Sequence, residues 1–219
     1  MLVNSNFLQQ VVITPDQYDW VNSNQPGVIR MMLDRMGGEQ ARATSLVKYA
    51  KGAHFPHHYH PGGEEILVLE GTFSEGSNHY SAGWYLRNPP GSKHQPFSPD
   101  GATIFVKLRQ MHPSESLPLR LNTNDQSLWT LEGREGKCPL FVSSTETVWL
   151  ERLRIGAILN TTKMMGLELL VMKGEVDMDG LAYPAGSWIR VPVGHITAIT
   201  ATQANTTIYI KTGHLQGVI

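Results

Sequence analysis

Apolar residues along this chain occur in short runs between glycines and prolines rather than at long helical spacing. The run Ile66–Leu69 lies between Gly63 and Gly71, a pattern typical of a buried strand. Val28–Asp34 alternates between apolar and polar positions, and Ala41–Tyr49 is a further strand candidate. The first half contains no clear amphipathic helix. The pattern therefore predicts an all-β protein built from many short strands.

The second half of the chain repeats the pattern of the first. Gly63–Gly71 resembles Gly166–Gly174, and Gly83–Gly91 resembles Gly186–Gly194. Both pairs share one offset of 103 residues (166 − 63 and 186 − 83). Matching runs at a constant offset indicate a duplicated domain.

Two stretches have the character of connections rather than of strands. Residues 111–128 are rich in proline, serine and asparagine, which is typical of a linker. Residues 1–27 are polar and rich in asparagine, and we interpret them as a loose lead-in with an edge strand at Gln10–Ile13. We therefore expect a first domain over residues 1–112, a linker over 113–127 and a second domain over 128–219.

Ionisable residues cluster around one turn of the first half. His58 and His60 are two residues apart, so in an extended strand both imidazoles point to one face while Tyr59 points to the other. Glu64 follows a proline–glycine turn and opens the buried strand. Two imidazoles and a carboxylate converging from neighbouring strands form half of a metal site. His94 offers a third imidazole on another strand.

Composition narrows the function classes. The formal net charge is −1, so neither nucleic acid nor an anionic membrane is an expected partner. No apolar stretch approaches the ~20 residues of a membrane span, and the N-terminus lacks the basic region and apolar core of a signal peptide. Cys138 is the only cysteine, which excludes an internal disulfide and fits a reducing cytoplasm. Any metal site must use histidine, aspartate or glutamate.

The two glycine-bounded segments closely resemble the two cupin motifs. The first motif, G-x5-H-x-H-x3-E-x6-G, is met by Gly52, His58, His60, Glu64 and Gly71. The second, G-x5-P-x-G-x2-H-x3-N, is met by Gly83, Pro89, Gly91 and His94, with Ser98 at the final position. The resemblance implies an antiparallel jelly-roll barrel, and two such barrels in tandem form a bicupin. It also implies one divalent ion per chain on His58, His60, Glu64 and His94. Zinc is the expected ion, with iron, manganese and nickel as alternatives.

Beyond these motifs, the sequences of three segments are similar to the cupin domain of ChrR-type anti-sigma factors. The similar segments are Arg42–Ala50, His60–Ser74 and Leu86–His94. In that family the cupin binds zinc and takes part in sensing oxidative stress, while a separate N-terminal zinc domain holds the sigma factor. We find no such domain in this sequence, and one cysteine could not supply its zinc site. Sigma-factor binding by the family's usual route is therefore not expected.

Two adjacent glutamates compete for the role of metal ligand, and the repeat distinguishes them. Glu65 aligns with Glu168, and Arg87 aligns with Arg190. The second half keeps this glutamate–arginine pair although it lacks the candidate metal ligands. The pair is therefore more consistent with a structural role than with metal binding. We therefore predict cross-strand ion pairs Glu65–Arg87 and Glu168–Arg190, which leaves Glu64 as the metal carboxylate.

The second half is expected to bind no metal. The positions opposite the four candidate ligands are Thr161, Lys163, Leu167 and Thr197. His195 lies two residues before the ligand position, and we interpret it as a loop histidine.

Three functions fit these features. The family resemblance implies a sensory or regulatory metal cupin in a transcriptional stress response. The alternative is a metal-dependent cupin enzyme, a dioxygenase, isomerase or decarboxylase acting on a small molecule, with Tyr85 and Lys107 as candidate bases. In a third interpretation the metal only stabilises the barrel. The expected partners are a small-molecule ligand in the first barrel and, by analogy, a second copy of the chain in a homodimer.

Overall fold

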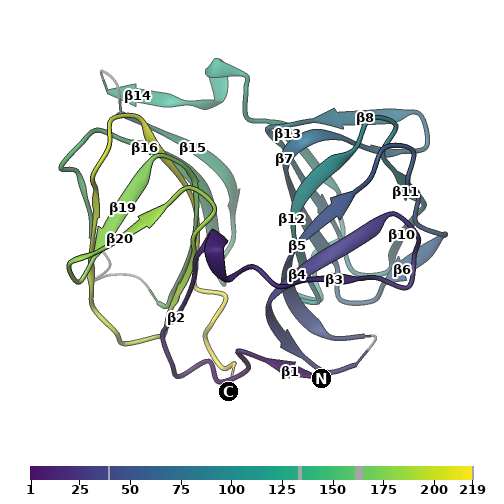
Figure 1. Ribbon diagram of the computed structural model, residues 1–219, viewed down its shortest axis with the longest axis horizontal. Helices are drawn as coiled ribbons and strands as arrows, with labels where there is room; N and C mark the ends of the chain where they lie inside the picture. Colours follow the sequence, from purple (N-terminus) through teal and green to yellow (C-terminus); the bar gives the residue numbers. More distant parts are fainter. Residues whose placement is uncertain (39, 133–134, 161–164, 219) are drawn as a thin grey trace. The chain divides into compact units, whose positions relative to one another are not determined.

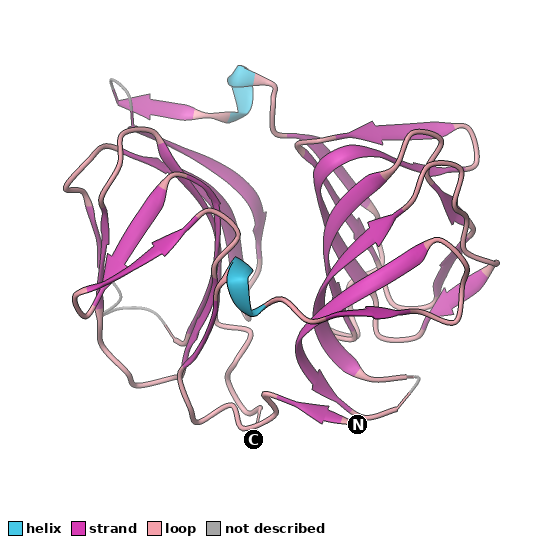
Figure 2. Ribbon diagram, in the orientation of Figure 1, coloured by secondary structure: helices cyan, strands magenta, loops and turns pink. Residues whose placement is uncertain are grey.

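The regular secondary structure of the described residues is almost entirely β-strand, as the apolar pattern predicts. The computed structural model describes residues 1–38, 40–132, 135–160 and 165–218. Within them, the helices are two single turns, η1 (Pro15–Gln17) and η2 (Gln126–Leu128) (Figure 2). None of the helices in these ranges is long and apolar enough to cross a membrane. The predicted all-β class is therefore confirmed. Thr161 and Lys163, the positions opposite His58 and His60, lie outside the described residues.

Two compact units make up the chain. The first contains residues 1–5 and 19–124, and the second contains residues 6–18 and 125–219. The expected edge strand at Gln10–Ile13 is present as β2 (Val11–Ile13), and it belongs to the second unit. There it pairs with β21 (Trp188–Val191), with Val11 opposite Arg190. The N-terminal segment thus completes a sheet of the second half.

The first unit contains one large antiparallel sheet (Figure 1). Its strands follow the order β1 (Leu2–Val3), β4 (Val28–Met36), β5 (Arg42–Tyr49), β12 (Ala102–Leu108), β7 (Glu64–Glu75), β9 (Trp84–Asn88) and β13 (Leu119–Asn122). Three further strands attach to this path: β3 (Trp20–Asn22) on β4, and β8 (Asn78–Ser81) and β11 (Pro96–Phe97) on β7. The strand β13 falls within the stretch expected to be a linker.

The sheet of the first unit does not close into the barrel that the cupin motifs imply. Its hydrogen-bonded path ends at β1 on one side and at β13 on the other. The reason lies in β6 (His58–His60) and β10 (Ser92–His94), which pair with each other in a separate two-stranded sheet. Because these strands bond to each other and not to the large sheet, the ladder is interrupted there.

Alternation along the strands produces the interior of the first unit. Ile104 and Val106 on β12 pack with Val28 and Ile66 in one buried cluster. Each fully buried aliphatic side chain of this kind contributes about 1.5–3 kcal/mol relative to an exposed one. The intervening residue Phe105 is equally buried but lies on the opposite face of its strand. Both faces of these central strands are therefore covered.

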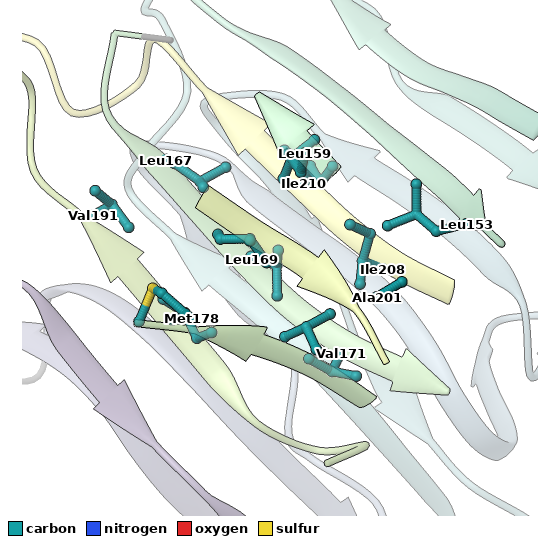
Figure 3. Packing of buried hydrophobic residues seen from close by; sticks show 13 residues of the cluster. Leu153, Leu159, Leu167, Leu169, Val171, Met178, Val191, Ala201, Ile208 and Ile210 are labelled. Atoms are coloured by element: carbon teal, nitrogen blue, oxygen red, sulfur yellow. The ribbon is translucent and has the colours of Figure 1, made fainter. Parts of the chain in front are cut away.

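The second unit is built from two antiparallel sheets. One has the order β14 (Thr130–Glu132), β15 (Glu135–Val142), β16 (Thr147–Leu153), β23 (Thr206–Thr212), β18 (Leu167–Lys173), β21 and β2. The other has the order β17 (Ile158–Asn160), β22 (Ala198–Ala201), β19 (Glu175–Met178) and β20 (Leu181–Pro184). Leu167, Leu169 and Val171 project from β18 into an apolar cluster between strands of both sheets (Figure 3). Leu167 occupies the position that corresponds to Glu64.

The single cysteine is fully buried in the second unit. Cys138 on β15 has no exposed surface, and burial raises the pKa of its thiol to about 11. The thiol therefore stays protonated at pH 8, where the reactive thiolate of an exposed cysteine would be appreciable. We expect native protein not to react with Ellman's reagent at pH 8 and to release one thionitrobenzoate per chain after unfolding in guanidinium. Rapid stoichiometric reaction of the native protein would contradict this burial.

Candidate metal centre

The four predicted ligands come from three short strand segments. His58 and His60 lie at the two ends of β6, Glu64 begins β7, and His94 ends β10. The β6–β10 ladder sets His94 directly opposite His58. Tyr59, between the two histidines of β6, points outward and is 64% exposed. Period-two alternation thus directs both imidazoles of β6 to the same side.

The donor atoms of these four residues converge. One ligand atom from each of them lies within 4.8 Å of all the others. The Nε2 atoms of His60 and His94 are 2.9 Å apart, and each is 3.4 Å from Oε2 of Glu64. Ligands about 2.1 Å from one ion at tetrahedral angles lie about 3.4 Å apart. The donor set and its spacing therefore fit a divalent ion.

Hydrogen bonds fix which nitrogen of two histidines faces the cluster. Nδ1 of His58 lies 2.8 Å from the carbonyl oxygen of Pro56, and Nδ1 of His94 lies 2.7 Å from a carboxylate oxygen of Glu75. Both oxygens can only accept, so each Nδ1 carries the proton and donates. The lone pair of a neutral ring is then on Nε2, and Nε2 of His94 lies within the cluster, 3.4 Å from Glu64. This is the usual arrangement of metal-binding histidines.

Arg120 donates hydrogen bonds to the two residues that hold Glu64 and His94 in place. Asn88 donates a hydrogen bond of 2.9 Å to Oε2 of Glu64. The Nη2 group of Arg120 donates to Oδ1 of Asn88 at 2.6 Å and to Oε1 of Glu75 at 2.8 Å. Because Glu75 accepts a hydrogen bond from Nδ1 of His94, Arg120 acts on both Glu64 and His94 through one intermediate residue each. These three supporting residues were not identified from the sequence.

The electrostatics of the cluster favour neutral imidazoles on β6 and an ionised carboxylate behind His94. Burial lowers the pKa values of His58 and His60. Burial alone would raise the pKa of Glu75, but hydrogen bonds from His94 and Arg120 outweigh it and lower this pKa to about 2. Burial likewise opposes charge on His94, yet its bond to Glu75 raises the pKa of the ring. Glu75 therefore remains ionised and orients the His94 ring.

Removal of the Arg120 guanidinium is expected to weaken metal binding without removing a ligand. In Arg120→Gln both Asn88 and Glu75 lose their charged donor, so Glu64 and His94 are held less firmly. Loss of such supporting contacts typically costs about 10–100-fold in metal affinity. Competition with a chromophoric chelator would measure this loss. Arg154→Gln, which removes an exposed guanidinium paired with Glu135, provides the matched control, and equal affinities of the two variants would contradict the role of Arg120.

A cavity of about 290 Å³ reaches the donor cluster. Its lining includes His58, His60 and Glu64, and its walls are largely apolar, formed by Val28, Val47, Phe55, Ile104, Val106 and Leu108. The candidate bases Tyr85 and Lys107 do not line it. The ammonium of Lys107 donates to Thr44, and the Tyr85 hydroxyl accepts from Arg87. A small molecule can therefore reach the donors within a mostly apolar enclosure.

The choice between the two adjacent glutamates agrees with the contacts. Glu65 lies opposite Arg87 across β7 and β9, and their side chains form an ion pair of 3.1 Å on the face away from the cavity. Arg87 also binds Glu115 at 2.8 Å, an additional carboxylate that the sequence did not point to. The predicted Glu65–Arg87 pair is therefore confirmed, while Glu64 faces the histidines.

The equivalent residues of the second unit lie opposite each other in the strand register, and Glu168 bonds to two other side chains. Glu168 lies opposite Arg190 in the register of β18 and β21. Its carboxylate accepts hydrogen bonds from Nε1 of Trp188 at 2.7 Å and from His214 at 2.9 Å. His195, interpreted as a loop histidine, is exposed and lies outside the strands. None of these groups resembles the donor cluster of the first unit.

A fold of antiparallel strands, with three histidines and one glutamate converging beside a cavity, defines a cupin. Residues 8–112 match the family model of the ChrR cupin-like domain. This part of the chain therefore belongs to the ChrR cupin-like family, as the sequence motifs predicted. A search of curated proteins found no match.

Solved structures with similar folds extend over both units. Bacterial pirin YhhW from Escherichia coli, solved in complex with nickel(II), is 12% identical, with 93% of this chain and 98% of that chain covered and a TM-score of 0.71. A putative glyoxylate-induced protein from Pseudomonas aeruginosa is 15% identical over 97% and 90% of the two chains, with a TM-score of 0.72. Salicylate 1,2-dioxygenase from Pseudoaminobacter salicylatoxidans is 13% identical over 94% and 81%, with a TM-score of 0.64. At these identities the likeness concerns the fold alone.

Proposed function

We propose that this protein is a metal-dependent cupin in which His58, His60, Glu64 and His94 hold one divalent ion. The observation that carries the proposal is the convergence of four donor atoms beside a cavity. A bound ion would supply a positive charge and a Lewis acid for an oxygen atom of a small molecule in that cavity. The protein residues would orient the ion through Glu75, Asn88 and Arg120 and exclude bulk water through the apolar walls.

The chain as a whole is, in this proposal, a bicupin with one metal-binding half. Its support is the constant repeat offset, the two compact units and similar structures that cover more than nine-tenths of the chain. The second unit would act as a structural partner, because Leu167 and its neighbours form an apolar cluster where the first unit has ligands. Zinc is the ion that we propose for the site, since imidazole and carboxylate donors at this spacing suit it.

The role that the family match supports best is sensory. Residues 8–112 match the ChrR cupin-like domain, so we propose a regulatory function in a transcriptional stress response. In this function the occupancy of the metal centre and its cavity would be the signal. The buried thiol of Cys138 is a poor candidate for a redox switch, so sensing would depend on the cupin site rather than on cysteine chemistry.

A metal-dependent cupin enzyme is the second candidate function. The observation that favours it is the cavity, which gives a small molecule access to the donors. One of the similar structures is a salicylate 1,2-dioxygenase, which is consistent with oxidative chemistry on an organic acid. An enzyme of this kind needs a metal able to take more ligands than the four side chains supply.

Metal analysis separates these functions. Protein purified without a metal-affinity tag should be examined by inductively coupled plasma mass spectrometry. One equivalent of zinc per chain would support the sensory cupin, whereas iron, manganese or nickel would favour the enzyme and justify a substrate screen with oxygen-uptake detection. Two equivalents would contradict a metal-free second unit. Absence of bound metal in the native protein would contradict the proposal as a whole.

A further inference from the structure

Arg30 lines the cavity that reaches the donor cluster, and its guanidinium has no partner among the residues that the structure describes. It lies on β4, half-buried, and lines the cavity. No hydrogen bond or ion pair joins its side chain to any residue in the described ranges. Arg35 and Arg109 also line the cavity, but they donate to backbone carbonyls of Gly38 and Gln40. A guanidinium carries five N–H donors, so the cavity holds unused donor capacity at Arg30.

Two residues with hydroxyl groups are neighbours of Arg30 in the sheet. In the β4–β5 register Arg30 stands opposite Val47, so Ser45 and Tyr49 are its diagonal neighbours on the same face. Both line the cavity, and neither hydroxyl bonds to a residue that the structure describes. Burial raises the pKa of Tyr49, the Glu64 carboxylate raises it further and Arg30 lowers it. Tyr49 thus lies within electrostatic range of both the metal ligand and the guanidinium.

The charges of the cavity favour an anion. Glu64 is the one acidic side chain among the described lining residues, and it faces the histidines. Arg30 remains as a cation on the adjoining wall, and a bound divalent ion would add further positive charge. Planar guanidinium groups match carboxylates in bidentate geometry. The remaining walls near Arg30 are aliphatic, with Val47, Ile104 and Val106 suited to an apolar body.

We propose that the cavity binds a small organic monocarboxylate, with the carboxylate on Arg30 and the Tyr49 hydroxyl and the apolar body on the aliphatic wall. The volume of about 290 Å³ lies at the small end of ligand pockets and limits the body to a short branched chain or one ring. The end of the ligand near His60 and Glu64 would face the ion. Only this last contact rests on the proposed metal function.

The test is direct binding of simple carboxylates. Isothermal titration calorimetry would use benzoate, isovalerate and cyclohexanecarboxylate, each beside its neutral amide, with metal-loaded and chelator-treated full-length protein. We expect at least one acid to bind, and its amide to bind about tenfold more weakly or worse, because a charge-assisted hydrogen bond is lost. Arg30→Gln should reduce binding of the acid by a similar factor, and Arg30→Lys by less.

Controls keep the result interpretable. Arg154→Gln removes the same charge from an exposed site and should bind the acid like the wild type. Tyr49→Phe removes a single hydroxyl and should weaken binding several-fold, which tests the site if Arg30→Gln fails to fold. Binding of no acid, equal binding of acid and amide, or unchanged binding by Arg30→Gln and Tyr49→Phe would overturn the proposal. Metal content measured on the same samples would reveal a failure of the metal centre separately, since carboxylate binding that depends on Arg30 can persist without the ion.

Discussion

Replacement of His60 by alanine is expected to abolish stoichiometric metal binding. His60 is 5% exposed, and its Nε2 atom lies within hydrogen-bond distance of His94 and 3.4 Å from Glu64. Loss of this ring removes a donor from the centre of the cluster, and no other described histidine is near enough to replace it. Metal per chain, measured by plasma mass spectrometry, should fall from one equivalent to background.

The neighbouring His57 provides the matched control for this result. It lies one residue before β6, is exposed and does not belong to the donor group. His57→Ala should therefore retain the full equivalent of metal. If both variants retained metal, the four-residue centre would be wrong. If both lost it, the effect would be a general loss of structure, which circular dichroism of the two variants would reveal.

Arg87→Met is expected to destabilise the first unit by about 3–5 kcal/mol, the usual cost of removing one partner from a buried ion pair. Arg87 is 1% exposed and holds Glu65 at 3.1 Å and Glu115 at 2.8 Å. Methionine fills similar space but leaves two carboxylates without their cation. Urea unfolding followed by circular dichroism would measure the change in the free energy of unfolding.

Two further variants distinguish a charge effect from a packing effect. Arg154→Met breaks an exposed pair with Glu135 and should cost about 0–1 kcal/mol. Glu65→Gln and Glu115→Gln, added to Arg87→Met, remove the unpaired charges and should restore part of the stability. A loss below about 1 kcal/mol for Arg87→Met would contradict the view that this arginine neutralises both carboxylates.

The convergence of the donor residues could be predicted because their spacing carries the geometry. His58 and His60 share a face through period-two alternation, and a short turn brings Glu64 beside them. The internal repeat separated Glu64 from Glu65, since only Glu65 has a counterpart in the second half. The ion pair between Glu65 and Arg87 confirms that reasoning.

The supports of the site could not be predicted, because they depend on pairing between strands that are distant in sequence. Arg120 reaches Glu75 and Asn88 only because β13 pairs with β9, and β13 lies in a stretch whose prolines and asparagines indicated a linker. His214 lies against Glu168 for the same reason, because β23 shortly before it pairs with β18. The closed barrel that the cupin motifs implied was wrong, because the motifs locate the ligand residues but do not say which strand ladders join.

The strand β2 also constrains the order in which the chain can fold during synthesis. Val11 emerges from the ribosome well before its partner Arg190 on β21, which lies 179 residues further along the chain (190 − 11). Until then β2 has no partner strand, and the segments between β2 and β21 must fold while β2 is unpaired. Such a long-range pairing is slow to form, because the closing loop is large. A fragment of the second half expressed without residues 6–18 would leave β21 with an open edge, which favours aggregation.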